Sequence, residues 1–232
     1  MPTKPVIVIE HLEPEISPWL LLEYRHCSKI YGKDFLFITN LPTKYHKLLG
    51  KYANVFEKSV KDLISENMLE KEATIILDPK SSVKLDFNTL NSAKYVIVGG
   101  ILGEHPPKGR TYELITKELK GVKSFNIGDG QFSIDGTVYY INHLLNNKTD
   151  EGLSFIDGVT IEYFEPVYFS VNLPFRYPLE NGEPVIAPGL KYYLQYRRLP
   201  EEVWREINDP QLHPHKMGMS SFNTKIVRSQ EA

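Results

Sequence analysis

The amino-acid sequence predicts an α/β fold: a mainly parallel sheet with helices on both faces, followed by a C-terminal appendage. Up to about residue 147, short β-branched runs alternate with stretches of helical period, which favours parallel strands joined by crossover helices. Beyond residue 150 the pattern changes to strands and proline-rich segments. A chain of 232 residues holds one domain more readily than two. We therefore expect a domain over residues 1–150 and an appendage over residues 151–232.

Composition and charge exclude several classes of protein. With 41% hydrophobic residues, 24% charged residues and no apolar run of membrane-spanning length, we expect a globular protein without a membrane partner. Cys27 is the single cysteine, and no histidine pair has the helical spacing of a metal site, so we expect neither a disulfide nor a metal. The first residues lack a signal-peptide pattern, which favours the cytoplasm. A formal charge of −2 argues against a whole surface built to coat nucleic acid, with a local basic patch as the alternative.

The first half of the domain is expected to contain two strands separated by a helix, and then a longer helical stretch. β-Branched and aromatic runs predict strands at residues 6–9 and 35–39. The Ser-Pro pair at residues 17–18 predicts a capped helix start, and Gly32 ends that helix. Its apolar stripe is Leu20, Tyr24, Cys27 and Tyr31. Residues 44–66 have a looser helical period that fits one helix or two.

The second half of the domain is expected to contain three more strands and two helices. Apolar runs predict strands at residues 74–77, 95–98 and 123–127. A short helix is expected over residues 111–119. Ser133 is placed to cap a longer helix, whose apolar stripe is Ile134, Val138, Ile141 and Leu145.

The appendage is expected to contain two strands, an irregular segment and a helix. The strands are predicted at residues 159–164 and 167–171, with a proline between them. Residues 173–190 carry four prolines and two glycines, which predicts a wrapping loop without regular structure. A helix is expected around residues 201–207, and a polar tail follows it.

Three of the expected strands lead into loops that suit a ligand. Residues 77–79, 99–107 and 127–133 follow parallel strands, so these loops meet at one edge of the sheet, where open α/β sheets bind ligands. The loop GGILGEHPP at residues 99–107 begins with two glycines, which allow close approach of a ligand to the backbone. An ordinary strand-to-helix turn is the alternative, and a phosphate loop fits worse because the loop contains neither GxxxxGK[ST] nor GxGxxG. We expect a pocket of small-molecule size.

Five strings carry a resemblance to a known family. They are IEH at residues 9–11, SPWLLLEY at 17–24, LDP at 77–79, GGILGEHPPKGRT at 99–111 and PFRYPLENGEPVIAPG at 174–189. In this order they resemble the small branch of the SPOUT superfamily of S-adenosylmethionine (SAM)-dependent methyltransferases, whose fungal member methylates an arginine of a small-subunit ribosomal protein. IGDGQFSIDG at residues 127–136 is also similar to the IGDY-type loop of the tRNA guanine-N1 methyltransferases.

The resemblance implies a C-terminal trefoil knot whose three loops bind SAM, and a protein substrate such as a small-subunit ribosomal protein. RNA is the rival substrate, because most of the superfamily modifies RNA, and a non-catalytic ribosome-associated protein is the third hypothesis. Most SPOUT enzymes pair, but the appendage could cover the pairing face, so the oligomeric state stays open.

The cofactor-binding residues follow from the same resemblance. It implies that backbone groups of Leu77, Gly100, Leu102, Ile127 and Phe132 hold adenine and ribose. The full expected set is Leu77, Asp78, Pro79, Gly99, Gly100, Ile101, Leu102, Gly103, Glu104, His105, Pro106, Ile127, Gly128, Asp129, Gln131, Phe132 and Ser133.

Three carboxylates are candidates for catalysis. Methyl transfer requires alignment of the acceptor and removal of its proton. For an arginine acceptor a carboxylate is the matched partner, since it accepts two parallel bonds from a guanidinium. Glu104, Asp129 and Glu10 each follow an expected strand end, and we rank Glu104 first. Each has a structural alternative: Glu104 could cap a helix, Asp129 could close its own turn, and Glu10 could be solvated.

Four residues are expected to contact the substrate: Glu10, His11, Arg110 and Arg176. Arg110 and Arg176 carry planar guanidinium groups that bind a carboxylate of the cofactor or of the substrate, although Arg176 could equally tie the wrapping loop to the core. His11 and His105 are second choices as bases, because an imidazole titrates near neutral pH. The alternative for both histidines is a bond to a backbone carbonyl.

Overall fold

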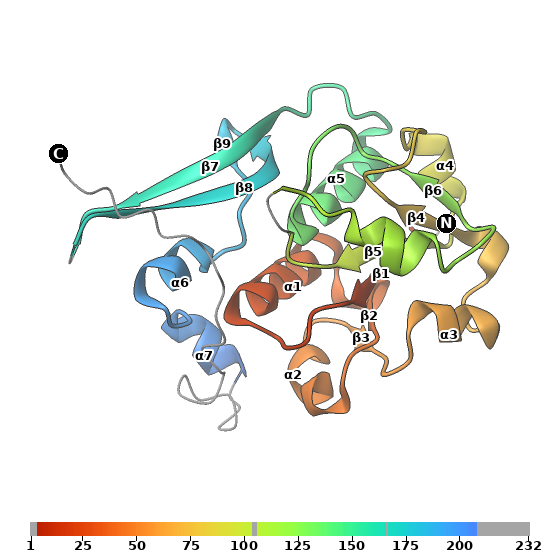
Figure 1. Ribbon diagram of the computed structural model, residues 1–232, viewed down its shortest axis with the longest axis horizontal. Coiled ribbons are helices and arrows are strands. Elements are labelled where there is room, and N and C mark those ends of the chain that lie inside the picture. The colour runs from red at the N-terminus through yellow and green to blue at the C-terminus, as the bar shows by residue number, and fades with distance from the viewer. Residues whose placement is uncertain (1–3, 104–105, 166, 208–232) are drawn as a thin grey trace.

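The computed structural model describes residues 4–103, 106–165 and 167–207, and its centre is a six-stranded sheet (Figure 1). The strands are β1 (Val6–His11), β2 (Leu36–Thr39), β3 (Asn54–Val55), β4 (Thr74–Leu77), β5 (Tyr95–Gly100) and β6 (Lys123–Phe125). They lie in the order β3-β2-β1-β5-β4-β6, and every neighbouring pair is parallel. The expected parallel α/β sheet is confirmed, and the strands that precede the three candidate loops, β4, β5 and β6, are adjacent.

Helices cover both faces of this sheet (Figure 1). The α-helices are α1 (Pro18–Tyr31), α2 (His46–Leu49), α3 (Val60–Ser65), α4 (Phe87–Ser92), α5 (Ile134–Asn147), α6 (Leu190–Tyr196) and α7 (Glu201–Ile207). Short 3₁₀ turns occupy Lys33–Phe35, Thr43–Tyr45 and Lys71–Ala73, and a π-helical turn occupies Tyr112–Thr116. α1 and α5 pack together on one face, and α3 and the π-helical turn cover the other. Among the described residues, none of the helices combines the length and the apolar composition that a membrane span requires.

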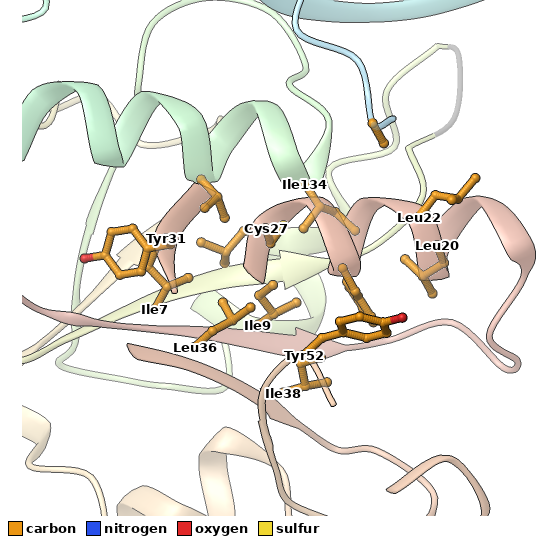
Figure 2. Packing of buried hydrophobic residues seen from close by; sticks show 14 of the residues in the cluster. Ile7, Ile9, Leu20, Leu22, Cys27, Tyr31, Leu36, Ile38, Tyr52 and Ile134 are labelled. Carbon is orange, nitrogen blue, oxygen red and sulfur yellow. The ribbon is translucent and has the colours of Figure 1, made fainter. Parts of the chain in front are cut away.

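The two-residue period of the strands divides the core between the two faces. Ile7 and Ile9 belong to the large cluster beneath α1 and α5, part of which is seen in Figure 2. Val8, between them, belongs to a second cluster with Ile76 and Ile97 on the opposite face. Both faces are buried, which explains why the strands appear in the sequence as continuous apolar runs.

Helix α1 begins and ends where its capping residues predict. The Ser17 hydroxyl accepts the Leu20 amide at 3.1 Å, Pro18 stands in the first turn, and Gly32 at φ 90° follows the last one. Cys27 lies on the buried face of the helix, and burial raises the pKa of its thiol well above the usual range. A thiol that stays protonated is a structural side chain and not a nucleophile.

Strand β5 runs two residues further than expected. Gly99 and Gly100 belong to the strand and pair with Glu10 and His11 of β1. A Cβ atom at Gly100 would lie 2.6 Å from the Tyr24 hydroxyl and 2.7 Å from the Glu10 carbonyl oxygen, so a side chain does not fit there. The expectation that the two glycines end the strand is wrong, because they allow the strand to continue under α1.

The appendage forms a second, antiparallel sheet of β7 (Phe155–Tyr163), β8 (Phe169–Glu180) and β9 (Glu183–Pro184). β7 and β8 make a long hairpin that projects from the domain (Figure 1). The irregular loop expected at residues 173–190 is wrong for its first part, because β8 runs through Pro174 and Pro178. Pro174 is tolerated because the register shifts opposite Gly158, at a β-bulge where a ladder bond is missing.

Several smaller elements complete the chain. The stretch 44–66 holds α2 and α3 with the edge strand β3 between them, and α4, which no pattern predicted, is capped by Asp86. α6 packs against α1, and the Arg25 guanidinium pairs with Glu206 of α7 at 2.6 Å. The expected helix at residues 201–207 is present as α7. The trefoil knot and the division of the chain at residue 150 remain predictions.

Candidate active site

A cavity of about 430 Å³ opens at the carboxyl ends of β4, β5 and β6. The structure brings together the three loops that follow these strands, so the edge of the sheet that the sequence indicated is hollowed. Apolar side chains from all three loops line it, among them Leu77, Ile101, Ile127 and Phe132. Hydrogen bonds made by polar groups of the same loops hold the walls of the cavity in place.

The loop after β4 is held by Asp78, which is buried. One oxygen of its carboxylate accepts the Lys80 amide at 2.9 Å, and the other accepts the Thr116 hydroxyl at 2.6 Å. The Asp78 amide donates to the Phe125 carbonyl at 2.9 Å. Asp78 thus ties the loop to β6 and to the π-helical turn, and it shapes the pocket wall.

The loop after β5 is closed by Glu13 and Arg110. The Glu13 carboxylate accepts the Leu102 amide at 3.0 Å and the Arg110 guanidinium at 3.1 Å. The same guanidinium nitrogen donates to the Leu102 carbonyl at 2.5 Å. Arg110 lines the pocket, and these bonds commit one of its nitrogens to joining the two ends of the loop. Its contact with a substrate or cofactor carboxylate stays a prediction.

The loop after β6 is shaped by glycines and by Asn126. Gly128 at φ 105° and Gly130 at φ 89° adopt a left-handed backbone that other residues disfavour. The Asn126 side chain donates to the Ser81 carbonyl at 2.8 Å and accepts the Gly128 amide at 3.0 Å, so it joins the first loop to the third. Ser133 ends the loop as the N-cap of α5, as expected.

Asp129 lies on the rim of the pocket and is exposed. Nearby, the Arg176 guanidinium pairs with Asp157 of β7 through two bonds of 2.6 Å each, and the Arg176 amide donates to the Gln131 carbonyl at 2.8 Å. This pairing holds the pKa of Asp157 below its usual range. Arg176 therefore ties β8 to β7 and to the pocket loop, which is close to the structural alternative weighed for it.

Glu10 and His11 lie inside the protein and do not line the cavity. The Glu10 carboxylate accepts the Thr39 hydroxyl and the Val60 amide, the latter at 2.9 Å, and burial raises its pKa. His11 lies 3.0 Å from the Tyr24 hydroxyl, and burial lowers the pKa of its ring to about 4, so it is neutral at neutral pH. The structure thus corrects their expected place at the mouth of the site: β1 extends through both residues as a buried strand.

The pocket includes most of the residues expected to bind a cofactor. Those that line it are Leu77, Asp78, Pro79, Gly99, Ile101, Gly103, Ile127, Gly128, Asp129, Gln131 and Phe132. Those that lie in or beside the loops without lining it are Gly100, Leu102, Pro106 and Ser133. Glu104 and His105 lie outside the described residues, so the carboxylate ranked first stays a prediction.

Sequence reasoning missed several pocket residues. They are Lys80, Ser81, Lys108, Gly109, Thr111 and Asn126. All of them stand within a few positions of residues that were singled out. The sequence thus located the three loops, but the segments predicted to line the pocket were too short. Asn126 is the clearest case, because a side chain between a strand and a Gly-Asp-Gly turn is well placed to bond to neighbouring loop backbone.

A pair of buried carboxyl groups lies behind the pocket at the start of α5. The Glu23 carboxylate accepts the Trp19 indole N–H at 2.7 Å and the Ile134 amide at 3.1 Å. Asp135 pairs with the His26 ring at 2.8 Å. Burial, and to a lesser degree the neighbouring Asp135, raises the pKa of Glu23 well above its usual range. No sequence pattern singled out this pair.

Fold and pocket together define a class of protein: an α/β protein that binds a small ligand where three adjacent parallel strands end. Within this class, the family model for proteins described as "protein arginine N-methyltransferase SFM1-like" matches residues 6–199. The chain belongs to this SFM1-like family. The resemblance to the SPOUT branch is thereby confirmed.

Known relatives agree with the family. The chain is 27% identical over 195 residues to protein arginine N-methyltransferase SFM1 of Saccharomyces cerevisiae, covering 79% of this chain and 91% of that protein. The crystal structure of the yeast enzyme complexed with SAM has a TM-score of 0.74 at 26% identity, covering 84% of this chain and 92% of that one. A dual-specific Trm10 of Thermococcus kodakaraensis shares the fold, with a TM-score of 0.50 at 16% identity over 62% of this chain and 94% of its own.

Proposed function

We propose that this chain is a SAM-dependent methyltransferase that modifies an arginine side chain of a protein. The observation that carries the proposal is the family match over residues 6–199, a range that includes all three loops of the pocket. The similarity to crystal structures of the yeast enzyme with SAM, SAH and MTA supports the same cofactor here.

The pocket residues fit this cofactor. A volume of about 430 Å³ falls in the range of small-molecule sites, roughly 300–1,000 Å³. Leu77, Ile127 and Phe132 provide apolar surface for an adenine ring. A Cβ atom at Gly99 would lie 3.1 Å from the Thr111 hydroxyl, so the bare glycine keeps this wall clear. When bound, SAM supplies a methyl group on a positively charged sulfur.

Asp129 is the described carboxylate that we propose to face the acceptor. A guanidinium is protonated at neutral pH and must lose a proton to become a nucleophile. A carboxylate that orients it through paired hydrogen bonds is placed to take that proton as the nitrogen gains the methyl group, and to release it to solvent at the rim. Asp129 lies on the exposed rim, where a protein side chain can reach it. Glu104, which the sequence ranks first, remains proposed for the same role.

We further propose that the substrate is a small-subunit ribosomal protein, that the enzyme acts in the cytoplasm, and that residues 151–232 shape the substrate side. The resemblance of the five sequence strings supports the substrate, and the single cysteine fits the reducing conditions of the cytoplasm. RNA is the less favoured acceptor, because the yeast relative is a protein arginine N-methyltransferase and a formal charge of −2 does not favour phosphate binding.

Transfer of a radiolabelled methyl group tests the proposal. Small-subunit ribosomal proteins and RNA from cells that lack this enzyme serve as acceptors, and we expect label in a protein band that survives nuclease. Label that nuclease removes would favour RNA. Heat on titration with SAM or SAH without a labelled product would favour the non-catalytic hypothesis, and no heat at all would overturn the cofactor site.

A further inference from the structure

The hairpin of β7 and β8 ends in exposed apolar side chains that the pocket does not use. Phe164, Val167 and Tyr168 are 70%, 71% and 49% exposed. The rings of Phe164 and Tyr168 lie 5.5 Å apart between centroids. We call these three residues the hairpin tip. Large apolar side chains gathered at the end of a projecting element mark an interaction site more often than chance exposure.

The hairpin tip is supported from one side by α6. The Tyr163 hydroxyl donates to the Lys191 carbonyl at 2.7 Å, and the Gln195 side chain donates to the Glu165 carbonyl at 3.2 Å. Just below the tip, the Tyr163 and Phe169 rings stack at 4.7 Å. The apolar side chains are therefore presented from a fixed base, which lowers the entropy lost when a partner binds.

The other end of the hairpin belongs to the pocket. The Arg176 amide of β8 donates to the Gln131 carbonyl of the third pocket loop at 2.8 Å. At a rise of about 3.4 Å per residue, the eight positions between Arg176 and Tyr168 place the tip about 27 Å from that loop. An extended peptide of about eight residues spans the same distance. One chain can therefore contact the pocket and the tip together.

Close to its tip the hairpin is acidic, whereas at its base the Arg176 guanidinium pairs with Asp157. Residues 149–175 contain no Lys, Arg or His. Of their acidic residues, Asp150 and Glu151 precede β7, and Asp157 pairs with Arg176. Glu162 and Glu165, which stand next to the tip, are exposed. A basic protein segment is complementary to these two carboxylates.

We infer that the hairpin tip docks the protein substrate, through a segment with apolar and basic side chains that lies about eight residues from the acceptor arginine. The inference rests on the proposed function and adds a second contact to it. A substrate that engages both contacts gains affinity from the linkage, and a short peptide that reaches only the pocket does not.

A triple variant, Phe164→Ser with Val167→Ser and Tyr168→Ser, tests the inference, because exposed side chains can be changed without disturbing the core. Its substrates are the labelled small-subunit protein and a nine-residue peptide centred on the arginine mapped by mass spectrometry. We expect KM for the intact protein to rise about tenfold, with kcat, the SAM Kd and activity on the peptide unchanged. Met68→Ser, which removes another apolar side chain that is 52% exposed, is the matched control.

The outcomes separate the inference from the proposed function. An unchanged KM in the triple variant, or equal losses on protein and peptide, would overturn docking at the tip while leaving the methyltransferase intact. A wild-type protein that labels neither substrate would overturn the proposed function itself. A dimer that the triple variant converts to a monomer in sedimentation would assign the tip to a second copy of the chain and overturn substrate docking.

The acidic contribution is tested separately. Glu165→Lys is expected to raise KM for the intact protein about threefold at low salt, and less at high salt because exposed charges are screened. Glu72→Lys makes the same change of charge at an exposed position before β4 and should leave KM unchanged. Equal effects of the two variants would show that net charge, and not the hairpin, attracts the substrate.

Discussion

The carboxylates of Glu10 and Asp129 follow strand ends in the sequence but lie in opposite environments. Glu10 is 5% exposed and accepts hydrogen bonds from Thr39 and from the first amide of α3. Asp129 is exposed on the rim of the pocket, in a turn between two left-handed glycines. The first carboxylate stabilises the fold, whereas the second is available to a ligand.

The difference shows when a residue near a strand end belongs to a ligand site, because ligands bind beyond the carboxyl ends of parallel strands. β1 continues through His11, so Glu10 still belongs to a strand that is buried on both faces. β6 ends at Phe125, so Asp129 is already four residues into a loop. An error of two residues in a strand end therefore moves a side chain from a pocket rim into a core.

The largest effect that we expect from testing this contrast between Glu10 and Asp129 is on catalysis. Asp129→Asn keeps the size of the side chain but removes the charge that orients and deprotonates a guanidinium. We expect kcat to fall about 100-fold, within the range for a general base, with the SAM Kd and the melting temperature unchanged. Single-turnover methylation and calorimetry measure these quantities.

The matched control for Asp129 is Glu151→Gln, which removes an exposed acid elsewhere and should keep wild-type activity. Full activity of Asp129→Asn would remove Asp129 from the reaction and leave Glu104 as the candidate. Loss of SAM binding in the variant would instead give Asp129 a role in holding the cofactor.

A smaller effect is expected at Glu10, and on stability alone. Glu10→Ala leaves the Val60 amide without its acceptor inside the protein and leaves the Thr39 hydroxyl with the Ile9 carbonyl at 3.3 Å, which costs about 2 kcal/mol of unfolding free energy. Glu10→Gln retains an acceptor oxygen and should cost less than about 1 kcal/mol. Urea unfolding measures both values, and kcat per folded molecule should stay at the wild-type level. A large loss of kcat in Glu10→Gln would return Glu10 to the active site.

The sequence was sufficient to predict the parallel sheet, because the period of the apolar residues and the caps of α1 are local signals. It also identified the edge of the sheet that is hollowed, since three parallel strands must deliver their loops to the same side. The long hairpin was missed at Pro174 because the bulge that tolerates the proline depends on the partner strand. Gly99 and Gly100 were misplaced for a similar reason, since only the packing of Tyr24 shows why a strand needs them.

The candidate site was less predictable than the fold. The bonds that close the pocket loops join residues far apart in the sequence, such as Glu13 with Arg110 and Asn126 with Ser81. No spacing rule connects these positions, because their meeting depends on the completed sheet. The same is true of Glu23 and Asp135, which come together only when α1 packs on α5.

Glu23 extends the comparison to a carboxyl group that is buried beside another acid. Burial raises the pKa of Glu23 in the folded protein. The stabilisation by the protonated Glu23 carboxyl is therefore fully present below the unfolded-state pKa of about 4.3. It is lost as the pH rises through the folded-state pKa. Glu23→Gln does not titrate at this position. We therefore expect the free energy of unfolding of the variant, relative to that of the wild type, to increase by on the order of 1 kcal/mol between pH 4 and pH 8.

Urea unfolding at several pH values measures this gain, with the exposed Glu151→Gln as a control that should follow the wild-type curve at every pH. Only the change with pH in the difference between the two unfolding free energies is diagnostic. The Gln side chain also alters the hydrogen bonds to Trp19 and to the backbone N–H of Ile134, but this effect is constant with pH. Parallel curves for Glu23→Gln and the wild type would mean that the pKa of Glu23 is the same in the folded and unfolded states. The hydrogen bonds to the Glu23 carboxylate would then offset the effects of its burial and of Asp135 on its pKa.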